Sequence, residues 1–148
     1  MIKCDKNMGM NSTASILLGE DNPADVYLIR QALEEHGIQY KLEIAAHGGE
    51  MIAALTRNTA EPPDLIILDL NLPRYDGLEI LKVIRQNNLL KEIPVVILTS
   101  SDSPRDRIAA SEFGADRYIR KPSKLDEFMA IGNALQLLLN NRRTAASR

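Results

Sequence analysis

Residues 65–73, LIILDLNLP, decide the fold of this chain. The stretch begins with four consecutive aliphatic side chains, a pattern typical of a strand that is buried on both faces of a parallel sheet. Asp69 follows this run directly, and the turn Asn71-Leu72-Pro73 leads toward a helix over about 76–86. We therefore expect one strand and one helix of an α/β protein, with an acidic side chain at the carboxyl end of the strand.

The remainder of the chain repeats this alternation of apolar strands and amphipathic helices. Further strands are predicted at residues 15–18, 41–45, 94–98 and 117–119. Helices are predicted over about 23–36, 50–57, 104–113 and 123–139, with Asn22 and Ser123 capping the first and the last. Because parallel strands need crossover connections, which pack right-handedly on both faces of a sheet, we expect one doubly wound α/β domain over 15–139 with a five-stranded parallel sheet. Residues 1–14 are predicted to be a flexible tail and residues 140–148 a polar tail.

Composition and charge exclude several classes of protein. The 148 residues suffice for one domain of ordinary size. With 18 basic against 20 acidic residues, the chain lacks the basic surplus of a dedicated nucleic-acid binder. The single cysteine, Cys4, cannot form an intrachain disulfide, which fits a reducing, cytoplasmic setting. No stretch reaches the roughly 20 apolar residues of a membrane span and the first residues do not form a signal peptide, so we expect no membrane contact.

Acidic side chains follow two strands that a sheet of order 2-1-3-4-5 places next to each other. Glu20 and Asp21 come after the first strand, and Asp69 comes after the third. Ligands of such sheets bind outside the carboxyl ends of the strands, so the three carboxylates are expected to share one crevice. Since three like charges repel one another, they need a cation. No histidine or cysteine lies at a strand exit, and an all-oxygen ligand set favours Mg²⁺, or Mn²⁺, over Zn²⁺.

Two further polar side chains are expected at the same edge of the sheet. Thr99 ends the fourth strand, and Lys121 follows the fifth. The metal ion and the Lys121 ammonium offset the charge of a phosphoryl group, and the Thr99 hydroxyl donates a hydrogen bond to one of its oxygens. Asp69 is then the predicted nucleophile, which forms an acyl phosphate.

Each of these residues, taken singly, also has a purely structural explanation. An aspartate after an apolar strand, such as Asp69, is often only a turn residue or a helix cap. Thr99 suits a strand, Lys121 suits a solvated surface, Tyr118 suits a packed aromatic, and Asp25 suits the first turn of a helix. The combination favours the functional interpretation, because one cause then places every required side chain at a strand end.

Together these residues resemble the receiver domain of two-component response regulators, over about residues 15–139. The matching positions are Glu20-Asp21, Asp69 within LDLNLP, Asp76-Gly77, Thr99-Ser100-Ser101, and Tyr118 three positions before Lys121-Pro122. The stretches NPAD (residues 22–25) and LDLNLP are most similar to small stand-alone regulators associated with phytochrome-type kinases. Glu20 in place of the common aspartate, and Gly19 in place of an aliphatic residue, depart from the usual pattern, and Gly19 is expected to loosen the end of the first strand.

The resemblance implies a flavodoxin-like, doubly wound sheet of order 2-1-3-4-5. It also implies a phosphoacceptor domain whose only phosphotransfer is to and from itself, rather than an enzyme. It implies that Asp69 accepts phosphate from a histidine kinase, here of phytochrome type. It also implies that Asp21, Asp69 and the backbone carbonyl of Asn71 bind Mg²⁺, for which Mn²⁺ can substitute, and that Glu20 assists through water. Lys121 is implied to contact the phosphoryl group.

The resemblance further implies a switch that starts at the phosphoryl group. Thr99 contacts that group, and Tyr118 changes rotamer as Thr99 is drawn inward. The peptide bond between Lys121 and Pro122 is expected to be cis, which turns the lysine into the site. Asn71 and Ser101, two positions beyond Asp69 and Thr99, are expected to flank the path of the attacking water and to set the phosphate lifetime.

Two other classes of protein share parts of this pattern. A phosphatase of the haloacid dehalogenase type also uses an aspartate nucleophile, Mg²⁺, a hydroxyl and a lysine, but it needs an acid two positions after the nucleophile, where this chain has Asn71. A flavodoxin-like cofactor binder shares the topology. The exit of the first strand nevertheless lacks a hydroxyl-rich and glycine-rich phosphate loop, and its acids repel a flavin phosphate.

The last predicted helix suggests how the domain signals. With nine residues after it, we expect no output domain, so the phosphorylated surface itself must bind a downstream protein. One apolar face of the helix is predicted to pack on the sheet through Leu125, Phe128, Gly132, Leu135 and Leu139. Ile131, Leu137 and Leu138 are predicted to project away from it and, with residues 104–119, to form a homodimer interface that strengthens on phosphorylation. The alternative is that they are surface apolar residues without a role, or are covered by the tail.

Overall fold

The computed structural model describes residues 12–57 and 61–146 and forms a five-stranded sheet of order β2-β1-β3-β4-β5. Every pair of neighbouring strands is parallel. The strands are β1 (Ala14–Gly19), β2 (Tyr40–Ala45), β3 (Leu65–Leu68), β4 (Val95–Thr99) and β5 (Arg117–Arg120). The predicted fold class and strand order are confirmed. Most of the predicted N-terminal tail, residues 1–11 with Cys4, lies outside the described residues.

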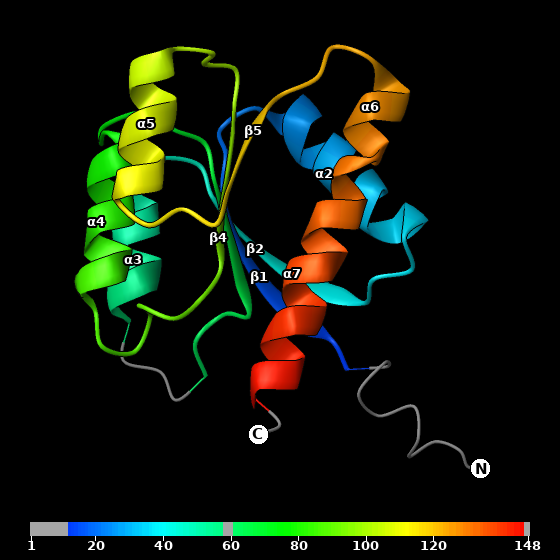
Figure 1. Ribbon diagram of the computed structural model, residues 1–148, viewed down its shortest axis with the longest axis horizontal. Helices are drawn as coiled ribbons and strands as arrows, with labels where there is room; N and C mark the ends of the chain where they lie inside the picture. The colour runs from blue at the N-terminus through cyan, green and yellow to red at the C-terminus, as the bar shows by residue number, and fades with distance from the viewer. Residues whose placement is uncertain (1–11, 58–60, 147–148) are drawn as a thin grey trace.

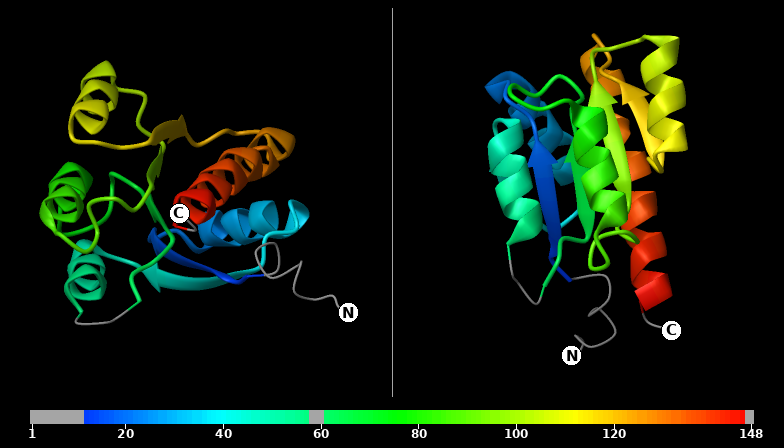
Figure 2. Two further views of the ribbon diagram at one scale, coloured as in Figure 1. Left: turned by 60° about the horizontal axis from the view of Figure 1, so that its bottom comes forward. Right: turned by 90° about the vertical axis from the view of Figure 1, so that its left-hand side faces the viewer.

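Helices cover both faces of this sheet, as Figure 1 shows. They are α2 (Pro23–Glu35), α3 (Gly48–Thr56), α4 (Gly77–Gln86), α5 (Pro104–Glu112), α6 (Leu125–Met129) and α7 (Ile131–Ala146). Helices α3, α4 and α5 lie on one face, and α2, α6 and α7 lie on the other (Figures 1 and 2). Because all strands run in one direction, their carboxyl ends meet at one edge of the sheet. In the part of the chain that the structure describes, no helix has the length and apolarity of a bilayer span.

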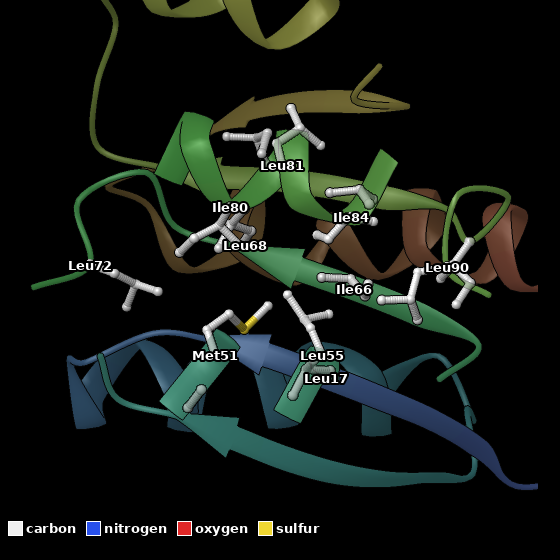
Figure 3. Close-up of a cluster of buried hydrophobic side chains, with 14 of the residues drawn as sticks. Leu17, Met51, Leu55, Ile66, Leu68, Leu72, Ile80, Leu81, Ile84 and Leu90 are labelled. Carbon is white, nitrogen blue, oxygen red and sulfur yellow. The ribbon is translucent and has the colours of Figure 1, made fainter. Parts of the chain in front are cut away.

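The sheet separates two apolar cores because successive side chains of a strand point to opposite faces. In β3, Ile66 and Leu68 pack against α3 and α4, whereas Leu65 and Ile67 pack against the helices of the other face. Figure 3 shows the first core, in which Ile66 and Leu68 of β3 lie opposite Met51 of α3 and the apolar side of α4. A strand buried on both faces must be apolar throughout, which explains why residues 65–68 are all aliphatic.

Local side chains set where several helices begin. Asn22 caps α2, where its Oδ1 accepts a hydrogen bond from the Ala24 N–H at 2.9 Å, as predicted. Helix α3 begins at Gly48, two residues earlier than predicted, because the His47 Nδ1 accepts from the Glu50 N–H at 3.2 Å and caps it.

The end of the chain differs from the prediction. The expected helix over 123–139 is divided at Ala130 into α6 and α7, and Lys124 rather than Ser123 occupies its N-cap position, without a side-chain hydrogen bond. Helix α7 continues to Ala146, so most of the predicted polar tail is helical. The sequence after Leu139 contains no glycine or proline that would end a helix.

The predicted interface on the last helix is largely wrong. Ile131 is 6% exposed and belongs to the core, and Leu138 is half-buried against the same core. The reason is helical spacing, since residues 131, 135, 138 and 139 form one stripe at intervals of four, seven and eight. Of the three predicted interface residues only Leu137, 55% exposed, faces away. Leu125, expected to pack on the sheet, is 64% exposed.

Candidate functional site

The predicted site residues meet at the carboxyl edge of the sheet. Glu20 follows β1, Asp69 follows β3, Thr99 ends β4 and Lys121 follows β5. Hydrogen bonds between neighbouring strands continue through these exits, since the Asp69 N–H donates to the Gly19 carbonyl at 3.0 Å and the Lys121 N–H donates to the Thr99 carbonyl at 2.8 Å. Gly19 is paired in register on both sides of β1, so the expected loosening of this strand end is wrong.

Three carboxylates of the site lie within reach of one cation. Glu20, Asp21 and Asp69 each place an oxygen within 4.8 Å of the others. Glu20 and Asp69 are buried at 2% and 4% exposure, whereas Asp21 is exposed. Hard divalent ions such as Mg²⁺ and Mn²⁺ prefer an oxygen donor set of this kind, so the residues present fit the predicted metal.

The Lys121 ammonium lies among the carboxylates. Its Nζ is 2.8 Å from Glu20 Oε1, 2.8 Å from Asp69 Oδ2 and 2.7 Å from Asp25 Oδ2. An ammonium has three hydrogens, so these three carboxylates take up its whole donor capacity. With Asp21 included, four carboxylates face one cation, and the site carries a net negative charge when all are ionised.

Burial and pairing shift two pKa values in this cluster. Burial raises the pKa of the Glu20 carboxyl above its ordinary value, and the hydrogen bond from Lys121 only partly opposes this. Burial acts in the opposite direction on Lys121, but hydrogen bonds to the three carboxylates outweigh it and raise the pKa of the ammonium above its ordinary value of 10.5. Lys121 is therefore a permanent positive charge near neutral pH.

The loop after β3 holds the Asp69 carboxylate in one orientation. While Oδ2 accepts from Lys121, Oδ1 accepts from the Asn71 backbone N–H at 3.0 Å. The loop returns to α4 at Gly77, where a Cβ would lie 2.5 Å from the Leu70 Cα, so only glycine permits this close approach of the two backbones. Asp76 caps α4 by accepting from the Leu78 N–H at 3.0 Å.

Thr99 is fully buried beside Asp69, and its hydroxyl has only long hydrogen bonds. The Asn71 Nδ2 and the Ser101 N–H each lie 3.4 Å from Thr99 Oγ1. The Ser101 hydroxyl instead donates to Asp106 Oδ2 at 2.7 Å, at the start of α5. The side chain of Ser101 is thus engaged with α5, whereas Asn71 is placed between Asp69 and Thr99.

Tyr118 lies on β5, outside the acidic cluster but linked to the Thr99 loop. Its hydroxyl donates to the Ser101 carbonyl at 3.0 Å. The Arg107 guanidinium of α5 stacks on the ring, 4.4 Å from its centre. A shift of the loop after β4 therefore changes the hydrogen bond of the half-buried tyrosine directly.

The peptide bond between Lys121 and Pro122 is trans, as is every peptide bond in the described ranges, so the prediction of a cis bond is wrong. The lysine reaches Asp69 through its long, flexible side chain from a backbone position that is hydrogen-bonded to β4.

One member of the cluster, Asp25, is not among the predicted site residues. Asp25 was expected only to complement the start of a helix, yet its carboxylate contacts Lys121 at 2.7 Å. A signal existed, because Asp25 lies in the first turn of a helix that begins directly after the acidic exit of β1. No local pattern indicates a partner 96 residues away.

Comparisons with known proteins agree with this geometry. A family model for the response regulator receiver domain matches residues 16–132. The chain is 37% identical over 130 residues to response regulator Rcp1 of Synechocystis sp., covering 85% of this chain and 88% of Rcp1. It is also 38% identical over 119 residues to the transcriptional regulatory protein TrcR of Mycobacterium tuberculosis, covering 80% of this chain but only 44% of TrcR.

Solved structures show the same similarity. The phosphorylated cyanobacterial phytochrome response regulator RcpA superposes with a TM-score of 0.77 at 35% identity, covering 84% of this chain and 92% of RcpA. The Mn²⁺-bound form of Rcp1 superposes with a TM-score of 0.76 at 37% identity, covering 83% and 91%. The chain belongs to the response regulator receiver domain family, whose members accept a phosphoryl group on an aspartate.

Proposed function

We propose that this protein is a signalling phosphoacceptor in which Asp69 takes a phosphoryl group from a histidine kinase. The bond between phosphorus and the kinase imidazole nitrogen breaks, a bond between phosphorus and an Asp69 oxygen forms, and the imidazole takes up a proton. The observation that carries the proposal is the placement of the Asp69 carboxylate, 2.8 Å from the Lys121 ammonium and within 4.8 Å of the other two acids.

The proposal includes a Mg²⁺ site, for which Mn²⁺ can substitute. Receiver domains bind divalent metal ions, and Asp21, Asp69 and the Asn71 carbonyl are the proposed ligands, with Glu20 acting through water. When bound, the ion supplies positive charge that offsets the repulsion between Asp69 and the incoming phosphate dianion. Lys121, whose Nζ lies 2.8 Å from Asp69 Oδ2, supplies further positive charge.

Signalling then follows from Thr99 and Tyr118. The Thr99 hydroxyl, whose present hydrogen bonds are long, donates to a phosphoryl oxygen and draws the loop after β4 inward. The Tyr118 hydroxyl bonds to Ser101 in that loop, so the tyrosine turns with it. Asn71 and Ser101 influence how fast water hydrolyses the acyl phosphate.

The proposed partners are proteins. A phytochrome-type kinase is the proposed donor, because the chain is similar to a phytochrome response regulator along most of both lengths. We place the protein in the cytoplasm, with a downstream protein rather than nucleic acid as the reader of its surface. We propose a homodimer that forms through exposed Leu137. Sedimentation of the parent protein and of Leu137→Asp, each with and without phosphorylation, tests it. Equal masses for the parent and the variant in both states contradict a dimer through Leu137.

Phosphorylation of purified protein tests the central claim. The protein is incubated with acetyl phosphate, or with phosphorylated phytochrome-type kinases, with Mg²⁺ or with EDTA, and separated on phosphate-affinity gels. We expect a shifted band only with Mg²⁺, and none with Asp69→Asn. Asp64→Asn is the matched control, because Asp64 precedes the same strand at its opposite end.

Two results would contradict the proposal. If Asp69→Asn still gives a shifted band, another residue is the phosphate acceptor. Steady turnover of a general phosphatase substrate favours an enzyme instead.

A further inference from the structure

Asp25 contacts the Lys121 ammonium from the first turn of helix α2. It is the third residue of α2, and its Oδ2 lies 2.7 Å from Lys121 Nζ, as close as either site carboxylate. Its side chain is 18% exposed and that of Lys121 is 10% exposed. Asp25 is not among the three acids that converge on the metal position.

The start of α2 does not need this carboxylate. An acid at the third position of a helix ordinarily reaches back to the N–H of the capping residue. Here the Asn22 N–H donates to Glu20 Oε2 at 3.2 Å, and the Asn22 side chain caps the helix by itself. Asp25 is therefore turned toward Lys121 and away from the helix end.

Phosphoryl transfer makes different demands on the three carboxylates that hold Lys121. Glu20 and Asp69 belong to the cluster that receives the metal and the phosphoryl group, so their oxygens change partners during the reaction. Asp25 alone of the three can keep its hydrogen bond throughout. Because Asp25 still holds the Lys121 ammonium, the ammonium can donate one hydrogen bond to a phosphoryl oxygen in place of Asp69 Oδ2 and stay in the same position.

We propose that Asp25 is a positioning residue that anchors the Lys121 ammonium while Asp69 is phosphorylated. The inference rests on the proposed function, because it gives Asp25 a part in the same reaction. It makes no claim that Asp25 touches the metal or the phosphoryl group.

Two measurements test the anchor. The first follows the ¹⁵N-labelled ammonium groups of the lysines by NMR, where the Lys121 signal, assigned with Lys121→Arg, is expected to be visible in the parent protein because its hydrogens are held. Asp25→Ala is expected to weaken and broaden this signal through faster exchange of hydrogens with water, because one of the three ammonium hydrogens loses its acceptor while Glu20 and Asp69 remain. Glu79→Ala, which removes an exposed first-turn acid from α4, is the matched control and is expected to leave it unchanged.

The second measurement separates rate from donor binding in phosphorylation by acetyl phosphate with Mg²⁺. Asp25→Ala is expected to lower the maximal rate by about tenfold, because a slightly misplaced charge stabilises the transition state poorly. The half-saturating concentration of acetyl phosphate and the Mn²⁺ affinity are expected to stay within about twofold, because no ligand to either is removed. Asp25→Asn, whose amide oxygen still accepts from Lys121, is expected to recover most of the rate.

The inference is overturned if Asp25→Ala is phosphorylated at the parent rate or if its Lys121 signal keeps the intensity and width that it has in the parent protein. Asp25→Ser, measured in parallel, guards against loss of folding in one variant, because serine suits the start of a helix but is too short to reach the ammonium. Failure of the proposed function looks different. In that case the parent protein is not phosphorylated at Asp69 at all, while the NMR comparison still decides whether Asp25 holds Lys121.

Discussion

Replacing Lys121 by methionine should destabilise the metal-free protein in a strongly pH-dependent way. Methionine preserves most of the buried stem but removes the charge that three carboxylates share at 2.7–2.8 Å. The side chains of Glu20 and Asp69, 1% and 5% exposed, are then left without a cation. Removing one partner of a buried ion pair costs about 3–5 kcal/mol.

Proton uptake limits this loss. In the variant, Glu20 can bind a proton and so lose its unpaired charge. Protonating a carboxyl with an ordinary pKa of 4.5 at pH 7 costs about 3.4 kcal/mol, at about 1.36 kcal/mol per pH unit. We therefore expect the free energy of unfolding to fall by about 3 kcal/mol at pH 7, and by less than about 1 kcal/mol at pH 5. Added Mg²⁺ should stabilise the variant more than the parent protein, because it restores the missing positive charge.

Urea unfolding followed by circular dichroism, in EDTA and in Mg²⁺ at both pH values, measures these differences. Lys124→Met is the control, since exposed Lys124 forms no ion pair within the ranges that the structure describes. A loss under about 1 kcal/mol at pH 7, the size typical of surface pairs, would refute the reasoning. So would a loss of equal size at pH 5, because the carboxylates would then not be its cause.

Three further predictions follow from the same structure. In EDTA, the free energy of unfolding should decrease as pH rises from 4.5 through the higher folded-state pKa of Glu20, because the folded protein binds the Glu20 proton more tightly than the unfolded chain does. Glu20→Gln should flatten this pH dependence in urea titrations between pH 4.5 and 7. Gly132→Ala should cost about 1–3 kcal/mol, because its Cβ would lie 2.7 Å from the Ala32 carbonyl oxygen of α2, and equal urea midpoints for variant and parent would contradict this close packing. Thr99→Ala should still be phosphorylated but should leave the Tyr118 ring resonances unchanged by phosphorylation in NMR spectra, and a normal shift of those resonances would contradict the proposed coupling.

Local chemistry was sufficient to predict most elements of the fold. Residues 65–68 and 95–98 are apolar without alternation, and in a chain of this length that pattern fits a strand covered on both faces. The parallel topology then follows from the helices between the strands, and it brings the residues at the strand exits to one edge. For this reason the sequence alone was sufficient to assign Glu20, Asp69, Thr99 and Lys121 to one site.

Errors arose where a residue's surroundings depend on distant parts of the chain. Ile131 was predicted to be exposed because one continuous helix was expected to pack through Leu125, Phe128, Gly132, Leu135 and Leu139. The helix is divided at Ala130, and Leu125 is exposed whereas Ile131 is buried with the other four. The start of α3 differed from the prediction for a local reason, because His47 caps it although histidine is not among the usual capping residues.

The sequence by itself determined the alternation of strands and helices and the chemical class of the site, because apolar runs, helix caps and strand exits are local patterns with few alternatives. Only the tertiary structure decided which acids share Lys121, since Asp25 and Lys121 are 96 residues apart and meet through the packing of α2 beside the end of β5. It also decided that Leu137 is exposed while Ile131 is buried, because the faces of α7 are set by its contact with α2 and the sheet. Burial and charge pairing are properties of assembled neighbours, and no single stretch of sequence contains them.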